Sequence, residues 1–504
     1  MIRLYGKLGL FFIVGATFAF SLFSAWVGFP AFRDQHLGTA LIFAKDGVDL
    51  LRPQIVGFNA NNMPTVLEFP VWQAGAAWFV RGCMGWWGGA NLFSLIVFSL
   101  GLIPVYRLGK RLLGNNGAWW APAMFCFQPV VFDYFGMAST DGLSLVAALW
   151  SYDRARAFAC QGGWFRGIGA VALAALAATT KLPFFMAAGL AVAFDVLPEN
   201  WRSTGVWGRL AAVAVSSGIF FLIWTRYTDS WFDKSLWPLV DLRVGHNPDM
   251  IYWYFGDWAY RFSPGVWLKA GWKAANGLFG SFAVAGLAFL GWSLPANREA
   301  RAWLCGGLVT TAIFSHVILH HGHYYLMFSP AVALGMAAGG LWLVEKAFAG
   351  NRAGYRVAIL VGVLLLVASL VQGLIGREIV LQFDPYPKTI ARQLAEKTSP
   401  QDRLMIVGGG WGGEALFRSN RQGLSIWNTR FLEDPANLQK ARELGFTKLV
   451  IVRESPLQVA LQKTNPGGAN YAGEPFSRYL SPVADGFPVL YEDEQLMIRK
   501  IPSP

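Results

Sequence analysis

The sequence predicts a polytopic α-helical membrane protein that ends in a small extracytoplasmic α/β domain. Of its 504 residues, 54% are hydrophobic and only 14% charged, whereas soluble globular proteins average about 25% charged residues. Apolar stretches close to the length needed to cross about 30 Å of hydrocarbon recur as far as residue 376. Charged residues become common after it. We therefore expect a transmembrane domain over 1–376 and an extracytoplasmic domain over 377–504.

We expect about eleven membrane spans. The apolar stretches lie at 8–26, 91–106, 117–132, 139–152, 167–184, 185–198, 210–225, 276–294, 302–319, 326–344 and 357–376. The first stretch is long, and no small-x-small cleavage site follows it, so it predicts a retained anchor rather than a signal peptide.

Basic residues set the expected orientation, because short loops rich in Lys and Arg stay in the cytoplasm. They lie in alternate connections, at Arg3, Lys7, Arg107, Lys110, Arg111, Arg154, Arg156, Arg202, Arg209, Arg298, Arg301, Arg352 and Arg356. This places the N-terminus in the cytoplasm and 377–504 outside the inner (cytoplasmic) membrane. Much of the net charge of +12 is therefore topological, and nucleic acid is not an expected partner.

The loops on the opposite side are long and rich in aromatic residues. They span 27–90 and 226–275, and aromatic side chains favour the membrane interface. Within the first loop, 34–46 and 66–86 predict helices that lie on the outer surface. We expect these loops to cover a cavity at the membrane boundary and to form the functional site.

The last 128 residues alternate helix and strand patterns, which is typical of a small α/β domain. Helices are expected at 386–398 and 433–444, strands at 403–408 and 448–453, and a hairpin at 487–491 and 495–500. The glycine-rich segment 408–413 predicts a turn, because its spacing does not match a nucleotide-binding fingerprint. The four cysteines are scattered singly, so no disulfide is expected.

The chemistry-bearing residues gather near the expected outer level of the membrane, where an ionised group is costly unless it is used or paired. Asp34 and Glu68 lie in the first outer loop, Asp141 lies at the outer mouth of the third and fourth spans, and Lys181 interrupts an apolar run. The outer end of the ninth span carries His321, His323, Tyr324 and Tyr325. We expect these groups to converge.

Each candidate also has a structural alternative. Asp34 and Asp141 could cap the helices that follow them, and Lys181 could extend its ammonium to the interface. A metal could bind His321 and His323, with Glu68 or Asp34 completing its shell, but local hydrogen bonding of the histidines is the commoner case. A phosphate could contact cations of the outer loops, or these could be solvated charges: Arg33, Lys234, Arg243, Arg261 and Lys269.

The order of these motifs resembles the GT-C class of integral membrane glycosyltransferases, which includes the dolichyl-phosphate-mannose–protein mannosyltransferases and the lipid A aminoarabinose transferases. The matching motifs are Asp34-Gln35, Glu68-Phe69-Pro70, Thr140-Asp141-Gly142-Leu143, Thr180-Lys181-Leu182-Pro183 and Tyr324-Tyr325 before Pro330. Two residues depart from the pattern, since Gln35 replaces a common Glu and Phe69 a common Lys. The donor-phosphate contact would then come from Arg33, Lys181 or an outer-loop Arg.

The resemblance implies transfer of a hexosyl or pentosyl group from a polyprenyl-phosphate donor to a lipid, glycan or protein acceptor at the outer face of the membrane. Asp34 would be the general base, with inversion at the anomeric carbon, and Asp141 would orient the acceptor or hold Arg33. No cofactor is required, although a divalent metal is allowed. The rival classes are a lipid or solute transporter, which would favour an internal repeat and charges at the midplane, and a non-catalytic membrane assembly protein.

Overall fold

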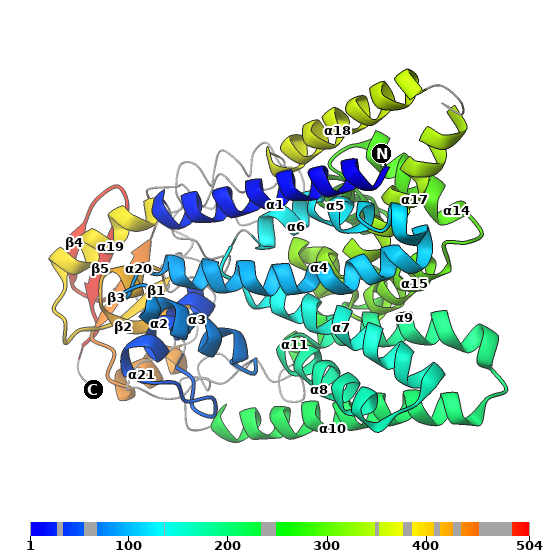
Figure 1. Ribbon diagram of the computed structural model, residues 1–504. Helices are drawn as coiled ribbons and strands as arrows, with labels where there is room; N and C mark the ends of the chain where they lie inside the picture. Colours follow the sequence, from blue (N-terminus) through cyan, green and yellow to red (C-terminus); the bar gives the residue numbers. More distant parts are fainter. Residues whose placement is uncertain are drawn as a thin grey trace. The chain divides into compact units, whose positions relative to one another are not determined.

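The computed structural model describes residues 2–27, 34–54, 68–135, 137–232, 248–347, 352–375, 386–407, 414–426, 435–452 and 486–502, and Figure 1 shows its ribbon. The chain forms two compact units. The helical unit comprises Met1–Ala25, Asn91–Thr225 and Asn247–Ile379, and the α/β unit comprises Trp26–Ala90, Arg226–His246 and Val380–Pro504. The expected domain boundary at 376/377 lies outside the described residues and stays a prediction.

The helical unit is built from helices of very unequal length. They are α1 (Ile2–Val27), α4 (Gly88–Gly117), α5 (Trp120–Cys126), α6 (Pro129–Phe135), α7 (Thr140–Gln161), α8 (Trp164–Thr180), α9 (Leu182–Asn200), α10 (Thr204–Phe232), α11 (Pro248–Phe255), α12 (Trp258–Arg261), α13 (Pro264–Ala274), η3 (Ala275–Phe279), α14 (Phe282–Ser293), α15 (Arg298–Ile313), α16 (Ser315–His320), η4 (Gly322–Phe328), α17 (Ser329–Ala347) and α18 (Arg352–Ile375). Every predicted span therefore overlaps helix.

Some predicted spans are broken. The stretch 117–132 divides between α5 and α6, and 302–319 divides between α15 and α16. Among the described residues, five helical segments are long and apolar enough to cross a membrane, and six if the pair 264–279 and 282–293, bent by 88°, forms one span. The chain thus has the helices of a multi-pass membrane protein, and the total of eleven spans stays a prediction.

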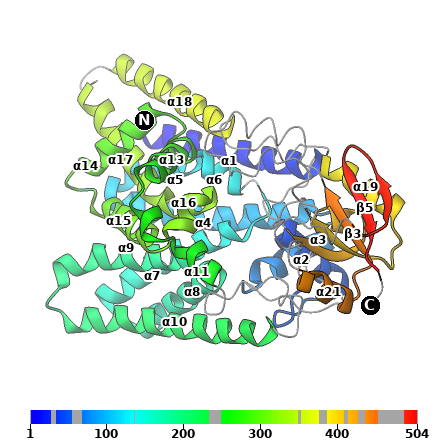
Figure 2. The ribbon, with the colours of Figure 1, turned by 180° about the vertical axis from the view of Figure 1, so that it is seen from behind.

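Glycine allows α14 and α17 to approach each other closely (Figure 2). A Cβ atom built on Gly339 of α17 would lie 2.0 Å from the main-chain oxygen of Leu287 in α14, and one on Gly291 would lie 1.9 Å from the oxygen of Gly335. Small residues at helix crossings are a general way to gain van der Waals contact where a bilayer supplies no hydrophobic drive for helix association. The Trp292 indole Nε1 also donates to the oxygen of Ala331 at 2.8 Å.

The α/β unit contains two helices from the loop 27–90, α2 (Asp34–Asp46) and α3 (Val71–Gly82). The prediction of a helix at 34–46 is confirmed, whereas the second helix is shorter than 66–86. The two helices pack together, and Arg81 donates through Nη2 to the Phe43 oxygen at 2.9 Å and through Nε to the Ala44 oxygen at 2.6 Å. This cation therefore bonds to two of the last carbonyls of α2, where a positive charge is favourable.

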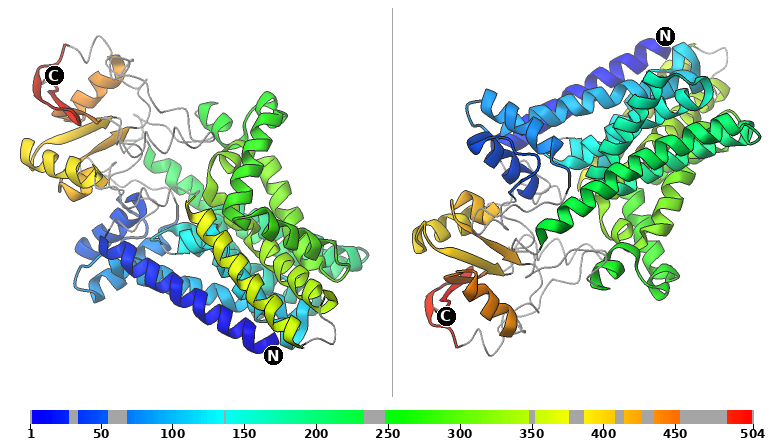
Figure 3. Two further views of the ribbon diagram at one scale, coloured as in Figure 1. Left: turned by 90° about the horizontal axis from the view of Figure 1, so that it is seen from above. Right: turned by 90° about the horizontal axis from the view of Figure 1, so that it is seen from below.

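A five-stranded sheet forms the rest of the described α/β unit, which Figure 3 shows from two sides. Its elements are α19 (Tyr386–Lys397), β1 (Arg403–Val407), α20 (Glu414–Arg418), β2 (Gln422–Ile426), α21 (Pro435–Glu443), β3 (Lys448–Val452), β4 (Val489–Glu492) and β5 (Leu496–Lys500). The strand order is β2-β1-β3-β5-β4, with β1 parallel to β2 and β3 and with β4 and β5 as the predicted antiparallel hairpin. The glycine-rich segment 408–413 lies outside the described residues.

Helix α2 and the segment just before α4 contact this sheet domain. Ile42 of α2 packs against the buried cluster that includes Leu394, Leu416 and Ile498, and the Arg418 guanidinium lies 4.7 Å from the centroid of the Trp87 ring. The segment that follows the first span is therefore fixed to the C-terminal part of the chain within one unit.

We predict that Gly339→Ala destabilises the protein by about 1–3 kcal/mol, because the new methyl group would collide with the backbone of α14. The neighbouring Gly340 has no atom within 4 Å of its built Cβ, so Gly340→Ala should leave stability unchanged or raise it slightly. Thermal unfolding of both variants in detergent measures the difference. Equal midpoints would contradict the close packing of α14 and α17.

Candidate active site

A buried pair of opposite charges lies at the start of α7. The Lys181 Nζ is 3.6 Å from the Asp141 Oδ1, and their side chains are 6% and 0% exposed. Ser139 is the N-cap of α7, since its Oγ accepts from the Asp141 main-chain N–H at 3.1 Å and donates to Asp141 Oδ2 at 2.8 Å. Ser139 thus fills the capping role that was the alternative for Asp141, whose carboxylate faces Lys181 instead.

Lys181 lies in a break between two helices. Its backbone is extended (φ −153°, ψ 96°), and it ends α8 and begins α9. Pro183 sits in the first turn of α9, where its missing N–H leaves no hydrogen bond unmade. Next to the break, the Ser144 Oγ of α7 donates to the Thr180 Oγ1 at 2.8 Å. The Thr-Lys-Leu-Pro motif therefore interrupts an apolar run and directs an ammonium group toward α7.

The short helix η4 brings aromatic groups to this pair. The Lys181 Nζ lies 5.8 Å from the centroid of the Tyr324 ring, and that ring lies 4.3 Å from His323 and 6.3 Å from Phe184. Four of the residues singled out in the sequence, Asp141, Lys181, His323 and Tyr324, thus gather in the helical unit. We call them the Asp141–Lys181 cluster.

Two other predicted residues, His321 and Tyr325, contact the segment 248–274. His321 lies 5.1 Å from His323 and 5.3 Å from Trp253 of α11, centroid to centroid. The Tyr325 hydroxyl donates to the main-chain oxygen of Ala270 in α13 at 3.3 Å. These contacts link η4 to the aromatic segment 248–274, whose composition led us to expect a role in the site.

The histidine of α16 that packs most closely here was missed by sequence reasoning. His316 lies between Tyr252 (4.8 Å) and Tyr260 (4.7 Å), and its Nδ1 is 3.0 Å from the Trp253 oxygen. His320 stacks on it at 5.6 Å. Burial, then the charges of Lys273 and His316, lower the pKa of His320 to about 4, so it is neutral at pH 7. In the sequence, only the i, i+4 spacing of His316 and His320 on a helix could have indicated that their rings lie together.

Two cations of the predicted set lie in the helical unit: Lys269 is exposed on α13, and Arg261 contacts main-chain carbonyls. Arg261 donates through Nε to the Phe255 oxygen at 2.8 Å and through Nη2 to the Ile313 oxygen at 3.3 Å. It also lies 5.4 Å from the Trp258 ring. These contacts join α11, α12 and α15, so a structural role is already satisfied, and its contact with substrate stays a prediction.

In the α/β unit, Glu68 contacts a histidine that the sequence analysis did not select. The His36 Nε2 lies 3.0 Å from Glu68 Oε2, and the His36 ring lies 6.5 Å from that of Trp72. Helix α2 begins at Asp34, but the Asp34 side chain lies outside what the structure describes. Arg33, Lys234 and Arg243 lie entirely outside the described residues.

No metal centre is assembled among the side chains that the structure describes. Within them, no group of three His, Cys, Asp or Glu residues has the arrangement of a metal site. The predicted ligand set, Asp34, Glu68, His321 and His323, includes one undescribed side chain and therefore stays a prediction.

Comparison with known proteins identifies the fold. No protein-family model and no curated protein matches the sequence. ArnT from Cupriavidus metallidurans does match in structure: its complex with undecaprenyl phosphate gives a TM-score of 0.59 at 13% identity over 97% of both chains. Its apo form gives 0.59 at 12% identity over 98% of this chain and 97% of its own. The chain has the GT-C fold.

A third solved structure is more distant. The Archaeoglobus fulgidus oligosaccharyltransferase in complex with zinc and sulfate gives a TM-score of 0.49 at 10% identity, over 91% of this chain and 70% of its own. The match to ArnT is sufficient by itself to identify the fold. The GT-C expectation, which rested on the order of five short motifs, is confirmed, as is a helical membrane protein with a small C-terminal sheet.

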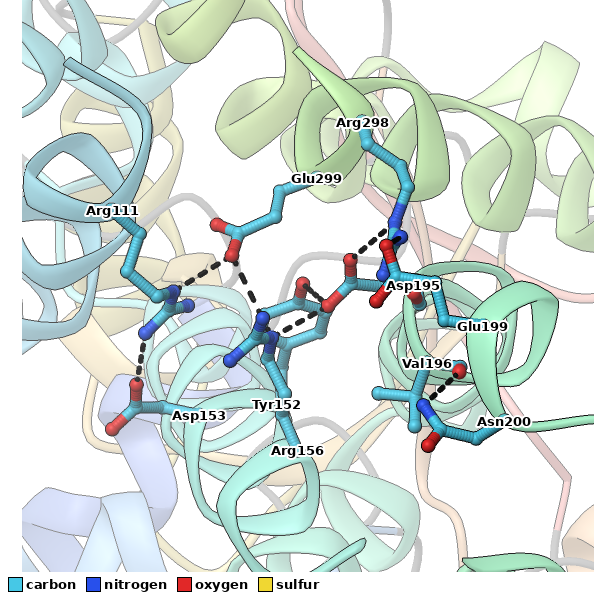
Figure 4. Close-up of polar contacts among 10 residues, drawn as sticks. All are labelled: Arg111, Tyr152, Asp153, Arg156, Asp195, Val196, Glu199, Asn200, Arg298 and Glu299. Atoms are coloured by element: carbon cyan, nitrogen blue, oxygen red, sulfur yellow. Dashed lines mark hydrogen bonds and ion pairs between the residues drawn. The ribbon is translucent and has the colours of Figure 1, made fainter. Parts of the chain in front are cut away.

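A second polar centre of this GT-C fold joins four helices (Figure 4). Arg111 of α4 bonds to Glu299 of α15 (2.8 Å) and Asp153 of α7 (2.9 Å). Arg156 of α7 donates to Asp195 of α9 at 2.7 Å. Tyr152 and Arg298 also donate hydrogen bonds to Asp195. Arg298 donates to Glu199 as well, and Arg107 donates to Asp153. We call this the four-helix ion network.

The four-helix ion network is balanced in charge, unlike an anion-binding site. Its carboxylates are Asp153, Asp195, Glu199 and Glu299, and its guanidiniums are Arg107, Arg111, Arg156 and Arg298. Along α7, Asp153 follows Asp141 by twelve residues, which is about 18 Å of helix. The network therefore fixes one end of these helices, whereas the Asp141–Lys181 cluster lies at the other.

We predict that Asp195→Asn lowers stability by about 1–3 kcal/mol, because the buried Asp195 carboxylate accepts charge-assisted hydrogen bonds that an amide cannot replace. Glu199 bonds to the same Arg298 but is 69% exposed, against 1% for Asp195. Glu199→Gln should therefore cost less than about 1 kcal/mol. Thermal unfolding in detergent compares the matched variants, and a similar loss in both would argue against a structural role for the buried network.

Proposed function

We propose that the protein is a glycosyltransferase that moves a sugar from a polyprenyl-phosphate donor to a lipid, glycan or protein acceptor. The reaction would take place at the outer face of the inner (cytoplasmic) membrane, with the N-terminus inside and the C-terminal domain outside. The observation that carries the proposal is the likeness to ArnT, whose structure contains undecaprenyl phosphate, over 97% of both chains. Because a fold alone does not determine function, the proposal also rests on the buried Asp141–Lys181 pair.

Lys181 is the proposed contact for the donor phosphate. The Lys181 ammonium, between the apolar helices α8 and α9, carries N–H donors for an anion, as an ammonium has three. A charge-assisted hydrogen bond is stronger where water is excluded. Asp141, at 3.6 Å, holds the side chain of Lys181 in the break between α8 and α9. As the glycosidic bond breaks, negative charge grows on the phosphate, and a fixed cation stabilises that charge.

Asp34 is the proposed general base. Its carboxylate would take the proton of the acceptor hydroxyl as the acceptor oxygen bonds to the anomeric carbon. The bond from that carbon to the phosphate oxygen breaks in the same step, so the polyprenyl phosphate leaves with the electron pair and the configuration inverts. Whether the transferred group is a hexosyl or a pentosyl depends on contacts to the sugar, for which the rings of Trp253 and Tyr252 are candidates.

The proposed reaction requires no cofactor, because a phosphate is already a good leaving group. A divalent metal at Asp34, Glu68, His321 or His323 is compatible with it. In the helical unit, the described histidines have aromatic neighbours. Aromatic rings can pack against the face of a sugar as well as against the edge of another ring.

We predict that Asp34→Asn leaves donor binding intact and lowers turnover by at least about 100-fold, since general-base catalysis contributes about 10²–10⁴-fold. The assay uses purified full chain in detergent with a panel of radiolabelled polyprenyl-phosphate sugars and follows both saturable binding and slow hydrolysis. Asp46→Asn is the matched control, because Asp46 is an exposed residue at the other end of α2.

The outcomes separate the levels of the proposal. Full turnover in Asp34→Asn would exclude Asp34 as the base while leaving the enzyme class intact. If wild-type protein bound no donor in the panel, the glycosyltransferase assignment itself would be wrong, and a transporter or an assembly protein would replace it.

A further inference from the structure

An apolar groove lies on the surface of the helical unit, away from the Asp141–Lys181 cluster. It has about 530 Å³ of open space and is lined by Phe158 of α7, by Gly167 and Val171 of α8, and by Ala212, Ser216 and Phe220 of α10 among others. This volume lies within the range of about 300–1,000 Å³ that is usual for ligand pockets. Ser216 is the one polar residue of the lining.

The helices around the groove have the surface of segments in contact with lipid. Helices α8 and α10 run side by side (Figures 1 and 2), and the Ser217 Oγ of α10 lies 3.4 Å from the Val171 oxygen of α8. Only 17% of the most apolar window of α10 is buried, and its exposed side chains include Ile219 and Phe220. A bilayer would therefore present acyl chains to this groove.

Two guanidinium groups flank one end of the groove. Gly162 and Gly163 form the turn from α7 to α8, and both have positive φ. The Arg209 Cζ lies 3.5 Å from a Cβ built on Gly162, and the Arg166 Nη1 lies 3.5 Å from one built on Gly163. Arg166 precedes the groove residue Gly167 by one position, and Arg209 precedes Ala212 by three, which is about one helical turn.

These guanidiniums retain donors that can meet an anion. Among the described residues, Arg209 makes one hydrogen bond, to the Ala159 oxygen at 2.8 Å, and Arg166 makes one, to the Gly162 oxygen at 3.2 Å. A guanidinium carries five N–H donors, so each has several more. No acidic residue occurs in 157–166 or 200–209, and Glu199 bonds to Arg298.

Aromatic side chains mark this end of the groove as a membrane boundary. Trp164 and Phe165 are 64% and 74% exposed, and their rings stack at 3.6 Å. Exposed Trp rings of this kind favour the level of lipid headgroups. In the proposed orientation, this is the cytoplasmic leaflet, which carries anionic lipid.

We infer that the groove between α8 and α10 binds an anionic phospholipid of the cytoplasmic leaflet, with its phosphate against Arg166 and Arg209 and one acyl chain along Ala212 and Phe220. The leaflet follows from the proposed orientation, but the site does not depend on the transferase reaction. Charge complementarity selects the headgroup, and the apolar lining accepts the chain.

Native mass spectrometry of the full chain tests the inference. The protein in detergent is titrated with dioleoyl-phosphatidylglycerol, and separately with dioleoyl-phosphatidylcholine as the probe with the same acyl chains. Wild type should bind one phosphatidylglycerol in preference to phosphatidylcholine. The double variant Arg166→Gln/Arg209→Gln should lose roughly tenfold in affinity for phosphatidylglycerol and keep its weak binding of phosphatidylcholine.

Matched variants keep the test decisive. Ala212→Phe should weaken both lipids by filling the groove, whereas Ala211→Phe, one position along the same exposed helix, should weaken neither. Arg202→Gln removes a cation that lies 4.6 Å from the exposed Trp201 ring and should have little effect. Equal binding of the two lipids by wild type, or unchanged phosphatidylglycerol affinity in the double variant, would overturn the inference. Dimers that disappear in Ala212→Phe would show that a second copy of the chain fills the groove.

Discussion

The four-helix ion network is the constraint on which the helical unit depends. A buried charge is tolerated when it is paired, and here each carboxylate of α7, α9 and α15 contacts a guanidinium on another helix. Asp195, almost fully buried, receives hydrogen bonds from three different side chains. These bonds fix the register of α7 against α9, and with it the opposite ends of the same helices, where Asp141 and Lys181 meet.

At those opposite ends, the chain departs from regular helix for a physical reason. Extended backbone at membrane depth is tolerated only where protein buries it or where it lines a cavity, and Lys181 is 6% exposed. The break between α8 and α9 therefore interrupts an apolar run and holds one ammonium group in place. A sequence that needed only to span the bilayer would have no use for a lysine there, which is why this pair, and not the larger ion network, is the candidate for chemistry.

Much of this arrangement could be predicted from the sequence because its signals are local. Span length predicts the helices, and the bounds of α2 follow from a helical pattern between a polar start and Gly47. The C-terminal hairpin and two strands follow from short apolar runs. The Thr-Lys-Leu-Pro and Ser-Thr-Asp motifs marked the two partners of the buried pair, although not their contact.

What could not be predicted depends on contacts between distant segments. The positive-inside pattern identified Arg111, Arg156 and Arg298, but nothing local marks Asp195 or Glu299 as their partners, which lie 39 to 188 residues away. His316 was missed because its neighbours come from α11 and α12, within a loop that showed only aromatic richness. Strand β2 was missed because Gln422-Gly-Leu-Ser-Ile426 has only two large apolar residues and contains a glycine.

The most direct test of the account is the binding of undecaprenyl phosphate, without a sugar, to the full chain in detergent. Intrinsic tryptophan fluorescence or native mass spectrometry can follow the titration in wild type, Lys181→Met and the control Lys346→Met, which removes an exposed lysine at the end of α17. The account predicts saturable binding that falls at least about tenfold in Lys181→Met, that is not restored in Asp141→Asn/Lys181→Met, and that is unchanged in the control. Wild-type affinity in a folded Lys181→Met protein would contradict it.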